Sequence, residues 1–126
     1  MRFLTMVKSK EPWSQPPQGL MDAIAKIGTE AFQKGTMVET GGLLPSAMGA
    51  KVRLRDGRIT VTDGPFSEAK EVIGGYAIFE LPSKKEAIEE TVKFMQLHKD
   101  HWPGWEGETE IRPIFTPPEF VPGTKL

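Results

Sequence analysis

The sequence predicts an α+β protein built as a two-layer sandwich with an added β-hairpin. Two segments with helical periodicity each lie between β-favouring segments, so the element order is β-α-β, then a hairpin, then β-α-β. Two helices connected in this way cover one face of a mainly antiparallel sheet. The order is typical of the ferredoxin-like class.

The first β-α-β unit is predicted from apolar patterning and from the residues that interrupt it. Arg2–Lys8 is nearly continuous β-favouring sequence, which indicates a buried strand, and prolines in residues 9–19 end it. A helix is predicted over Leu20–Lys34, with Gly35 as its stop and a strand at Met37–Leu44 after it. The helix follows from apolar residues that recur on one helical face: Leu20, Ile24, Ile27 and Ala31.

The clearest local pattern is a hairpin around Asp56-Gly57. Apolar residues alternate with polar ones in Lys51–Arg55 and again in Arg58–Thr62. An Asp-Gly pair favours a two-residue hairpin turn, because both turn positions need a positive φ angle.

The second β-α-β unit begins with a strand at Gly75–Leu81. Ser83 and Glu86 then have the spacing of a capping box, in which the two side chains satisfy the first free amides of a helix. The last strand is predicted at Glu110–Phe115, where Pro113 indicates a sheet edge or a bulge. The buried side of the second helix is expected to carry Ala87, Ile88, Val92 and Met95.

Both helices lie on one face of such a sheet, so its other face is left open. Val, Ile, Phe and Tyr stand at both phases of the strands, which favours burial of that second face. The sequence therefore predicts a homodimer through the open sheet face. Glu80 alternates in phase with Tyr76 and Ile78, so it is expected on the same face as those two residues.

Composition excludes several classes of function. At 126 residues the chain fits one domain, and a net charge of -1 gives no electrostatic footprint for nucleic acid or anionic membranes. The absence of cysteine excludes disulfides, thiolate nucleophiles and cysteine-ligated metals. No signal peptide or membrane-spanning segment is recognised, so the expected location is the cytoplasm. No cofactor is expected, because neither a phosphate loop nor a dinucleotide fingerprint is present.

One stretch between two predicted strands carries the candidate chemistry. It opens with the turn Asp63-Gly64-Pro65-Phe66 and contains four ionisable side chains: Asp63, Glu68, Lys70 and Glu71. It is either a structural corner, in which Asp63 accepts hydrogen bonds from amides two residues on and Phe66 anchors the loop in the core, or a functional site. In the second interpretation Asp63 is a general base or orients a ligand, and the other three ionisable side chains bind it.

Arg112 is the remaining candidate for ligand binding. It lies on the last predicted strand, where a partly buried arginine needs a carboxylate partner. It either forms a structural ion pair at the sheet or dimer face, or it binds a carboxylate of the substrate. Four residues are candidate partners for it: Asp63, Glu68, Glu71 and Glu80.

Histidine and tryptophan gather near the end of the second predicted helix. His98 and His101 are expected at a solvated helix terminus, where a positive imidazole suits the helix dipole. A metal site needs a third ligand, so no metal is predicted there. Trp102 and Trp105 either cap the core or line a pocket, and Trp13 is positioned in the sequence to join them.

The central stretch resembles a family signature. Val61–Glu71, followed by Gly74-Gly75-Tyr76, is similar to the signature of the bacterial DGPF proteins within the YCII-related superfamily. The resemblance extends from the first strand to Phe115, so residues 1–116 are expected to form the YCII-related/DGPF domain and residues 117–126 a Pro-rich tail. Supporting matches outside the stretch are Arg53, Gly57, Ser83, Glu86-Ala87 and Glu110-Ile111-Arg112-Pro113.

The resemblance implies more about architecture than about chemistry. It implies a small ferredoxin-like protein, usually a homodimer whose sheets face each other. Some DGPF proteins are found associated with sigma factors of the extracytoplasmic type. In the wider superfamily a His-Asp pair near the first helix is proposed as an active site, with dehydrohalogenase-like chemistry in one branch. The first predicted helix here, Leu20–Lys34, contains no histidine, so this chain departs from that pattern.

We therefore expect a protein that binds a small polar or anionic molecule in a cleft between the sheet, the DGPF loop and the partner subunit, with weak acid-base catalysis through Asp63. The alternative is a non-catalytic interaction or regulatory module, associated with a sigma factor, in which the loop is only a structural corner. A binding protein needs a pocket on the order of hundreds of Å³ into which Asp63, Lys70 or Arg112 points.

Overall fold

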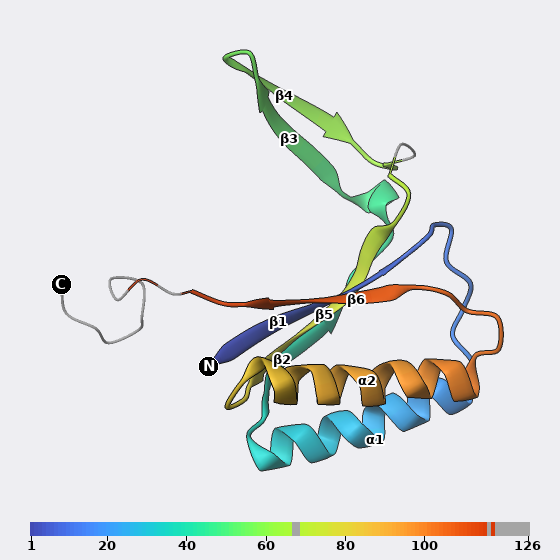
Figure 1. Cartoon of the computed structure of the whole chain (residues 1–126). Helices are drawn as coiled ribbons and strands as arrows, with labels where there is room; N and C mark the ends of the chain where they lie inside the picture. Colours follow the sequence, from blue (N-terminus) through green and yellow to red (C-terminus); the bar gives the residue numbers. More distant parts are fainter. Residues whose placement is uncertain (67–68, 116, 118–126) are drawn as a thin grey trace.

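The computed structural model describes residues 1–66, 69–115 and 117. Within these residues a four-stranded sheet forms the body of the protein and a two-stranded sheet stands apart from it (Figure 1). The elements follow in chain order: β1 (Arg2–Ser9), α1 (Gln18–Lys34), β2 (Met37–Gly42), the 3₁₀-helix η1 (Ser46–Met48), β3 (Ala50–Arg55), β4 (Arg58–Asp63), β5 (Val72–Glu80), α2 (Lys84–His101) and β6 (Glu108–Pro113).

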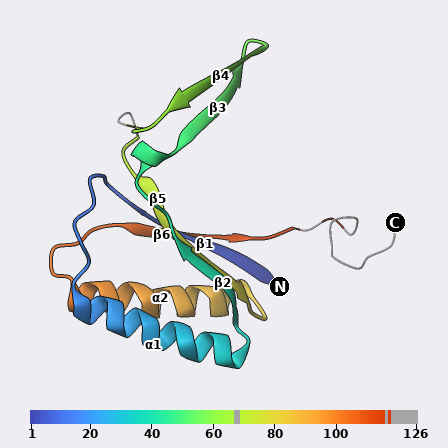
Figure 2. The same cartoon turned by 180° about the vertical axis from the view of Figure 1, so that it is seen from behind.

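The main sheet is antiparallel and confirms the predicted α+β class. Its neighbour order is β2-β5-β1-β6, so β1 pairs with β5 on one side and with β6 on the other. Both helices lie on the same side of this sheet in the two opposite views (Figures 1 and 2). The arrangement is compatible with the ferredoxin-like sandwich expected from the sequence. As Pro113 indicated, β6 is an edge strand, although it begins and ends two residues earlier than predicted.

The hairpin forms as predicted, but it does not extend the main sheet. Asp56 and Gly57 have φ angles of 52° and 73°, which are the positive values that a two-residue hairpin turn requires. The two strands pair only with each other, and the hairpin projects away from the helices (Figure 1). Its apolar side chains share one face and remain between 68% and 71% exposed: Val52, Leu54, Ile59 and Val61.

Helix α1 begins two residues before its predicted start and ends where Gly35 predicts. Gly35 has a φ angle of 75°, and its N–H approaches the carbonyl oxygens of Ala31 and Phe32. This left-handed residue closes the helix in the way that glycine commonly does. Leu20 and Ala31 are buried, as expected from the apolar face. None of the described helices is long and apolar enough to cross a membrane.

Helix α2 is rotated relative to the prediction. Ala87 is buried as expected, but Ile88 and Val92 are 44% and 59% exposed, so that part of the predicted buried side is wrong. The side that meets the protein carries Ala87, Thr91, Phe94 and His98 instead. Threonine and histidine are amphipathic, so the apolar pattern alone misplaced this face by about one residue.

The capping box at the start of α2 forms only in part. Ser83 occupies the N-cap position, but its hydroxyl donates to the Glu86 carboxylate and makes no capping bond to the helix backbone. The hydrogen bond from Ser83 is the main cause that lowers the pKa of Glu86, and backbone amides contribute to the same shift.

The core lies between the sheet and the start of α2. Phe3 is fully buried there and packs in one cluster with Leu81 and Ala87, against which Phe79 and Ile111 are also packed. Because side chains alternate along a strand, the neighbours of Phe3 on β1 face away from the helices. The open face of the sheet therefore carries Leu4, Met6, Tyr76 and Ile78, all of which are partly exposed.

Charged pairs border this open face. Glu80 lies on it, as expected, and forms an ion pair with Arg2 at 3.5 Å. Tyr76 donates its hydroxyl hydrogen to Glu39 at 3.1 Å, and this bond is the main cause that raises the pKa of Tyr76. The Tyr76 ring also covers Gly41, where an added Cβ would lie 2.9 Å from it. The face thus has an apolar centre and a polar border.

Candidate functional site

The DGPF turn forms a tightly packed corner between the hairpin and the main sheet. Gly64 donates its N–H to the carbonyl oxygen of Gly49 at 2.9 Å. A Cβ atom built on Gly64 would lie 1.6 Å from the carbonyl oxygen of Ser46 in η1, which leaves no room for any side chain. The Gly64–Pro65 peptide bond is cis. The glycine of the motif is therefore required by the close approach of two backbone segments.

Ser46 links this corner to the segment that follows β1. The Glu11 carboxylate accepts hydrogen bonds from the Ser46 N–H, at 2.9 Å, and from the Ser46 hydroxyl. The Ser46 hydroxyl oxygen in turn accepts from the Phe66 N–H at 3.1 Å. Phe66 packs beside Gly49 and beneath the Lys51 amino group, 4.4 Å from the ring centroid, and not in the main core as predicted. The turn is held by hydrogen bonds within the chain.

Asp63 is exposed at the end of β4. The expected hydrogen bonds from nearby amides to its carboxylate are absent among the described residues. Asp63 also lies outside the residues that line the large cavity described next. Glu68 falls outside the described residues.

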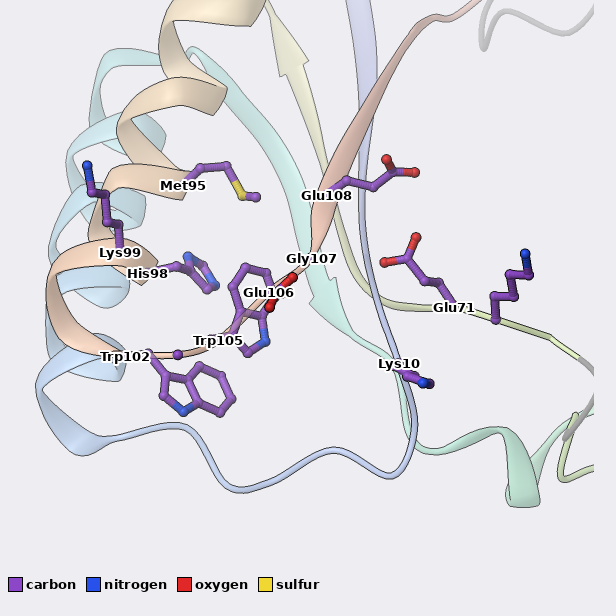
Figure 3. A pocket seen from close by; sticks show the side chains of 12 residues that line it. Lys10, Glu71, Met95, His98, Lys99, Trp102, Trp105, Glu106, Gly107 and Glu108 are labelled. Atoms are coloured by element: carbon purple, nitrogen blue, oxygen red, sulfur yellow. The ribbon is translucent and has the colours of Figure 1, made fainter.

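Lys70 and Glu71, which follow the DGPF turn, line a cavity of about 890 Å³. The other walls come from the segment after β1, from the last turns of α2 and from the loop between α2 and β6. Figure 3 shows Trp102, Trp105 and His98 on one side of the cavity, with Lys10, Glu71 and Glu108 on the other. The cavity thus joins an aromatic wall to a charged one.

The aromatic wall is a stack of rings that starts within α2. His98 lies 4.6 Å from Phe94 and 4.5 Å from Trp105 between ring centroids, and Trp105 stacks on Trp102 at 5.8 Å. The prediction that both histidines are solvated is wrong for His98, which is only 6% exposed, whereas His101 is exposed. Trp102 and Trp105 line the pocket, which was one of the two interpretations left open.

Gly107 fixes the position of Trp105. A Cβ atom on Gly107 would lie 2.5 Å from the Trp105 ring and 2.7 Å from the carbonyl oxygen of Lys8. Only a glycine lets the indole ring and strand β1 approach the chain so closely at this point. The spacing between Trp105 and Gly107 was available in the sequence, but nothing there showed that the two residues touch.

The His98 imidazole is held by the helix that carries it. Its Nδ1 lies 3.0 Å from the Phe94 carbonyl oxygen, one turn earlier in α2. When Nδ1 carries the proton it donates to this oxygen, and Nε2 is then the acceptor nitrogen of the ring. With its orientation held by this hydrogen bond, the His98 ring contributes a flat surface to the cavity wall.

Three lysines contribute positive charge to the cavity: Lys10, Lys70 and Lys99. Among the described residues, none of these amino groups forms an ion pair. The sequence predicted a ligand-binding role for Lys70 but not for Lys10 or Lys99, which reach the cavity from distant segments. Three glutamates also line the cavity: Glu71, Glu106 and Glu108.

Lys8 balances part of this negative charge from the neighbouring strand. Its amino group donates a hydrogen bond to Glu110, and this bond is the main cause that raises the pKa of Lys8. Glu108 and Glu71 add smaller contributions in the same direction. The same bond from Lys8 is the main cause that lowers the pKa of Glu110. Glu71 and Glu108 therefore interact through charge with Lys8, whose amino group is already hydrogen-bonded to Glu110.

Arg112 does not reach the cavity. It donates to Glu110 at 3.1 Å, on the same strand, and its side chain is 69% exposed. Its carboxylate partner among the described residues is Glu110 and not Asp63, Glu71 or Glu80, and the fourth candidate, Glu68, lies outside the described residues. With Lys8 and Glu110 it forms a charged row at the edge of the open sheet face.

Trp13 packs away from the other two tryptophans. Its ring lies against Gly74 in β5, where an added Cβ would be 3.3 Å from it. Its indole nitrogen is buried without a hydrogen-bond partner among the described residues. Among the residues that the structure describes, no group of three or more His, Cys, Asp or Glu side chains could hold a metal ion.

A match to a known protein family includes most of these elements. No curated protein matches the sequence. A family model described as the YCII-related domain matches residues 1–96. The matched stretch contains the hairpin, the DGPF corner and most of α2, but it ends before His98, so His98, Trp102 and Trp105 lie outside it. Because the match includes more than half of the chain, this protein belongs to the family of YCII-related domain proteins.

Proposed function

We propose that this protein binds a small organic anion with a planar, apolar part in the cavity beside the DGPF loop. The observation that carries the proposal is the pair of unlike walls. The amino group of Lys10, which has no ion-pair partner among the described residues, stands on one side with the carboxylates of Glu71 and Glu108, and Lys70 comes from the same segment as Glu71. The stacked rings of Trp102 and Trp105 stand on the other side (Figure 3). Ammonium groups attract carboxylates and phosphates, and indole rings stack on planar groups.

The size and position of the cavity agree with this function. Its volume of about 890 Å³ falls within the range of small-molecule sites. The DGPF corner is held by contacts of Ser46, Glu11 and Gly64, and Lys70 and Glu71 follow shortly after this fixed part of the chain. Rigid placement of binding residues reduces the entropy that a ligand must otherwise overcome.

Replacement of Lys70 by methionine tests the proposal, because it removes the charge and keeps most of the side chain's length. Loss of one charge-assisted contact is expected to weaken binding of aromatic carboxylates by about tenfold to a hundredfold. The measurement is the thermal shift of the purified protein with a panel that includes 4-hydroxybenzoate, phenylpyruvate and phenyl phosphate.

Lys85→Met is the matched control, since Lys85 lies at the start of α2 and does not line the cavity. It should retain the full thermal shift. The proposal fails if no member of the panel stabilises the wild-type protein, or if the two lysine variants lose the shift equally.

We further propose that two copies associate through the open sheet face. Leu4, Met6, Tyr76 and Ile78 form its apolar centre, and a face of this kind is favoured for burial against a second sheet. The hairpin supports association as well, because an isolated two-stranded hairpin with an exposed apolar side has little stability of its own.

The molar mass in solution tests this association. Wild-type protein should elute with twice the chain mass of 14.0 kDa when light scattering is recorded at micromolar concentration. Ile78→Lys should shift it to the monomer, because a charge would be buried in the interface. Val92→Lys places the same charge on the outer side of α2 and should leave the dimer intact. A monomeric wild-type protein would refute the proposed dimer.

A further inference from the structure

A second cavity, separate from the first, lies between the helices and the sheet. Its volume is about 540 Å³, and residues of α1, α2, β1, β2, β5 and β6 surround it. Helix α1 contacts mainly α2 and β2, so side chains do not fill all of the space between this helix and the rest of the sheet. The apolar wall includes Ile24, Ile27, Met37, Phe79 and Phe94. No tryptophan stands among the described residues that line it.

The hydroxyl groups on this wall are already used within the chain. Thr5 donates to the carbonyl oxygen of Ala77 at 3.2 Å, and Thr91 donates to that of Ala87 at 2.8 Å. Thr109 contacts the Met95 sulfur at 3.2 Å. Buried water needs two to four polar partners, roughly, and these three hydroxyls have already donated their hydrogens, so each can only accept a further bond. The cavity is thus better suited to an apolar occupant than to ordered water.

Gly28 leaves part of this cavity open. It lies in the middle of α1 and lines the cavity, and an added Cβ would meet no atom within 4 Å. Glycine inside a helix costs about 1 kcal/mol relative to alanine, and here neither a close contact nor a positive φ requires it. The missing side chain therefore has no structural explanation within the chain, but it does leave free space in a cavity that Phe79 and Phe94 also line.

We propose that this cavity binds one uncharged, largely apolar molecule of about one to three rings or the equivalent aliphatic size. An anion is disfavoured, because Glu90 is the one charged residue among the described residues of the wall. The ligand class thus differs from that of the cavity beside the DGPF loop. The two sites are independent, and either can exist without the other.

Fluorescence titration with the neutral dye N-phenyl-1-naphthylamine tests this site, because the dye brightens in an apolar environment. Wild-type protein should bind it saturably with one dye per chain. Gly28→Phe should weaken binding by about tenfold or more, because the ring occupies the cavity. Gly28→Ala should bind within about twofold of wild type and melt at a higher temperature, since alanine favours the helix.

Ala77→Leu provides a second blocking substitution from the opposite wall, in case Gly28→Phe does not fold. Unsaturable dye binding by the wild-type protein, or equal binding by the wild type and a folded blocking variant, would overturn the proposal. If dye binding and dimer formation exclude each other, the proposal is also overturned. In that case a segment of the second copy would be the natural occupant of the cavity. Thermal shifts with aromatic carboxylates should be the same in Gly28→Phe as in wild type, which separates the two sites.

Discussion

Gly64→Ala is expected to destabilise the protein by roughly 3 kcal/mol or more, the largest effect of adding a methyl group at any glycine that the structure describes. The new Cβ atom would lie 1.6 Å from the carbonyl oxygen of Ser46, so either η1 or the turn must move. Such a movement would also break the bond between the Gly64 N–H and the Gly49 carbonyl. Urea denaturation followed by circular dichroism measures the change in the free energy of unfolding.

Gly49→Ala is the matched control for this prediction. Gly49 belongs to the same corner, but a Cβ atom there would lie 3.5 Å from the Ser46 oxygen and 3.7 Å from the Phe66 ring, which are ordinary contacts. Its φ angle of -109° also suits alanine. We expect a change of less than about 1 kcal/mol. Equal stabilities of the two variants would show that the corner is looser than the structure indicates.

Gly107→Ala is expected to cost roughly 2–3 kcal/mol and to displace Trp105 from the cavity wall. The added methyl group would come within 2.5 Å of the indole ring and 2.7 Å of the Lys8 carbonyl oxygen. Displacement of Trp105 breaks its stacking on Trp102 and its tilted ring contact with His98. Near-ultraviolet circular dichroism should therefore lose its tryptophan signal, and binding of aromatic carboxylates should weaken in parallel.

A double-mutant cycle identifies which clash dominates. In a Trp105→Ala background the ring is gone, so Gly107→Ala should cost less than it does in the wild type. Gly42→Ala is the control, because an added Cβ at Gly42 meets nothing within 4 Å. A Gly107→Ala protein with wild-type stability and an unchanged tryptophan signal would contradict the proposed role of this glycine.

Local chemistry made much of the fold predictable. The Asp56-Gly57 turn, the stop at Gly35 and the edge position of Pro113 depend on the backbone properties of single residues, and all three are confirmed. The buried side of α2 was predicted less well, because Thr91 and His98 pack inward although neither is strongly apolar. Amphipathic residues blur a pattern that counts only hydrophobicity.

The site was predictable only where its residues are close in sequence. Lys70 and Glu71 could be selected because they follow a recognisable turn, but Lys10, Lys99 and Glu108 reach the same cavity from three other segments. A single sequence does not show that residues from distant segments lie close together in the fold. The ion pair of Arg112 with Glu110 was missed for a different reason: side chains two positions apart lie on the same face of a strand, whereas the predicted partners all came from other segments.

The structure also divides the DGPF stretch into two parts. In its first part, Gly64 and Phe66 are held by hydrogen bonds with Gly49 and Ser46, while the Asp63 side chain is exposed. Its last part, Lys70 and Glu71, faces the large cavity. The structural-corner interpretation thus agrees with the contacts of Gly64 and Phe66, whereas the ligand-binding role of Lys70 and Glu71 is our proposal.

The central claim is that the cavity beside the DGPF loop binds an organic anion against the stacked tryptophans. The most direct measurement is the NMR spectrum of the three indole N–H groups during titration with 4-hydroxybenzoate, phenylpyruvate and phenyl phosphate. We predict that the Trp102 and Trp105 signals shift saturably with at least one of these compounds, while the Trp13 signal, which belongs to a ring packed on Gly74, stays in place. Unchanged Trp102 and Trp105 signals throughout the titrations, or a shift confined to Trp13, would contradict the claim.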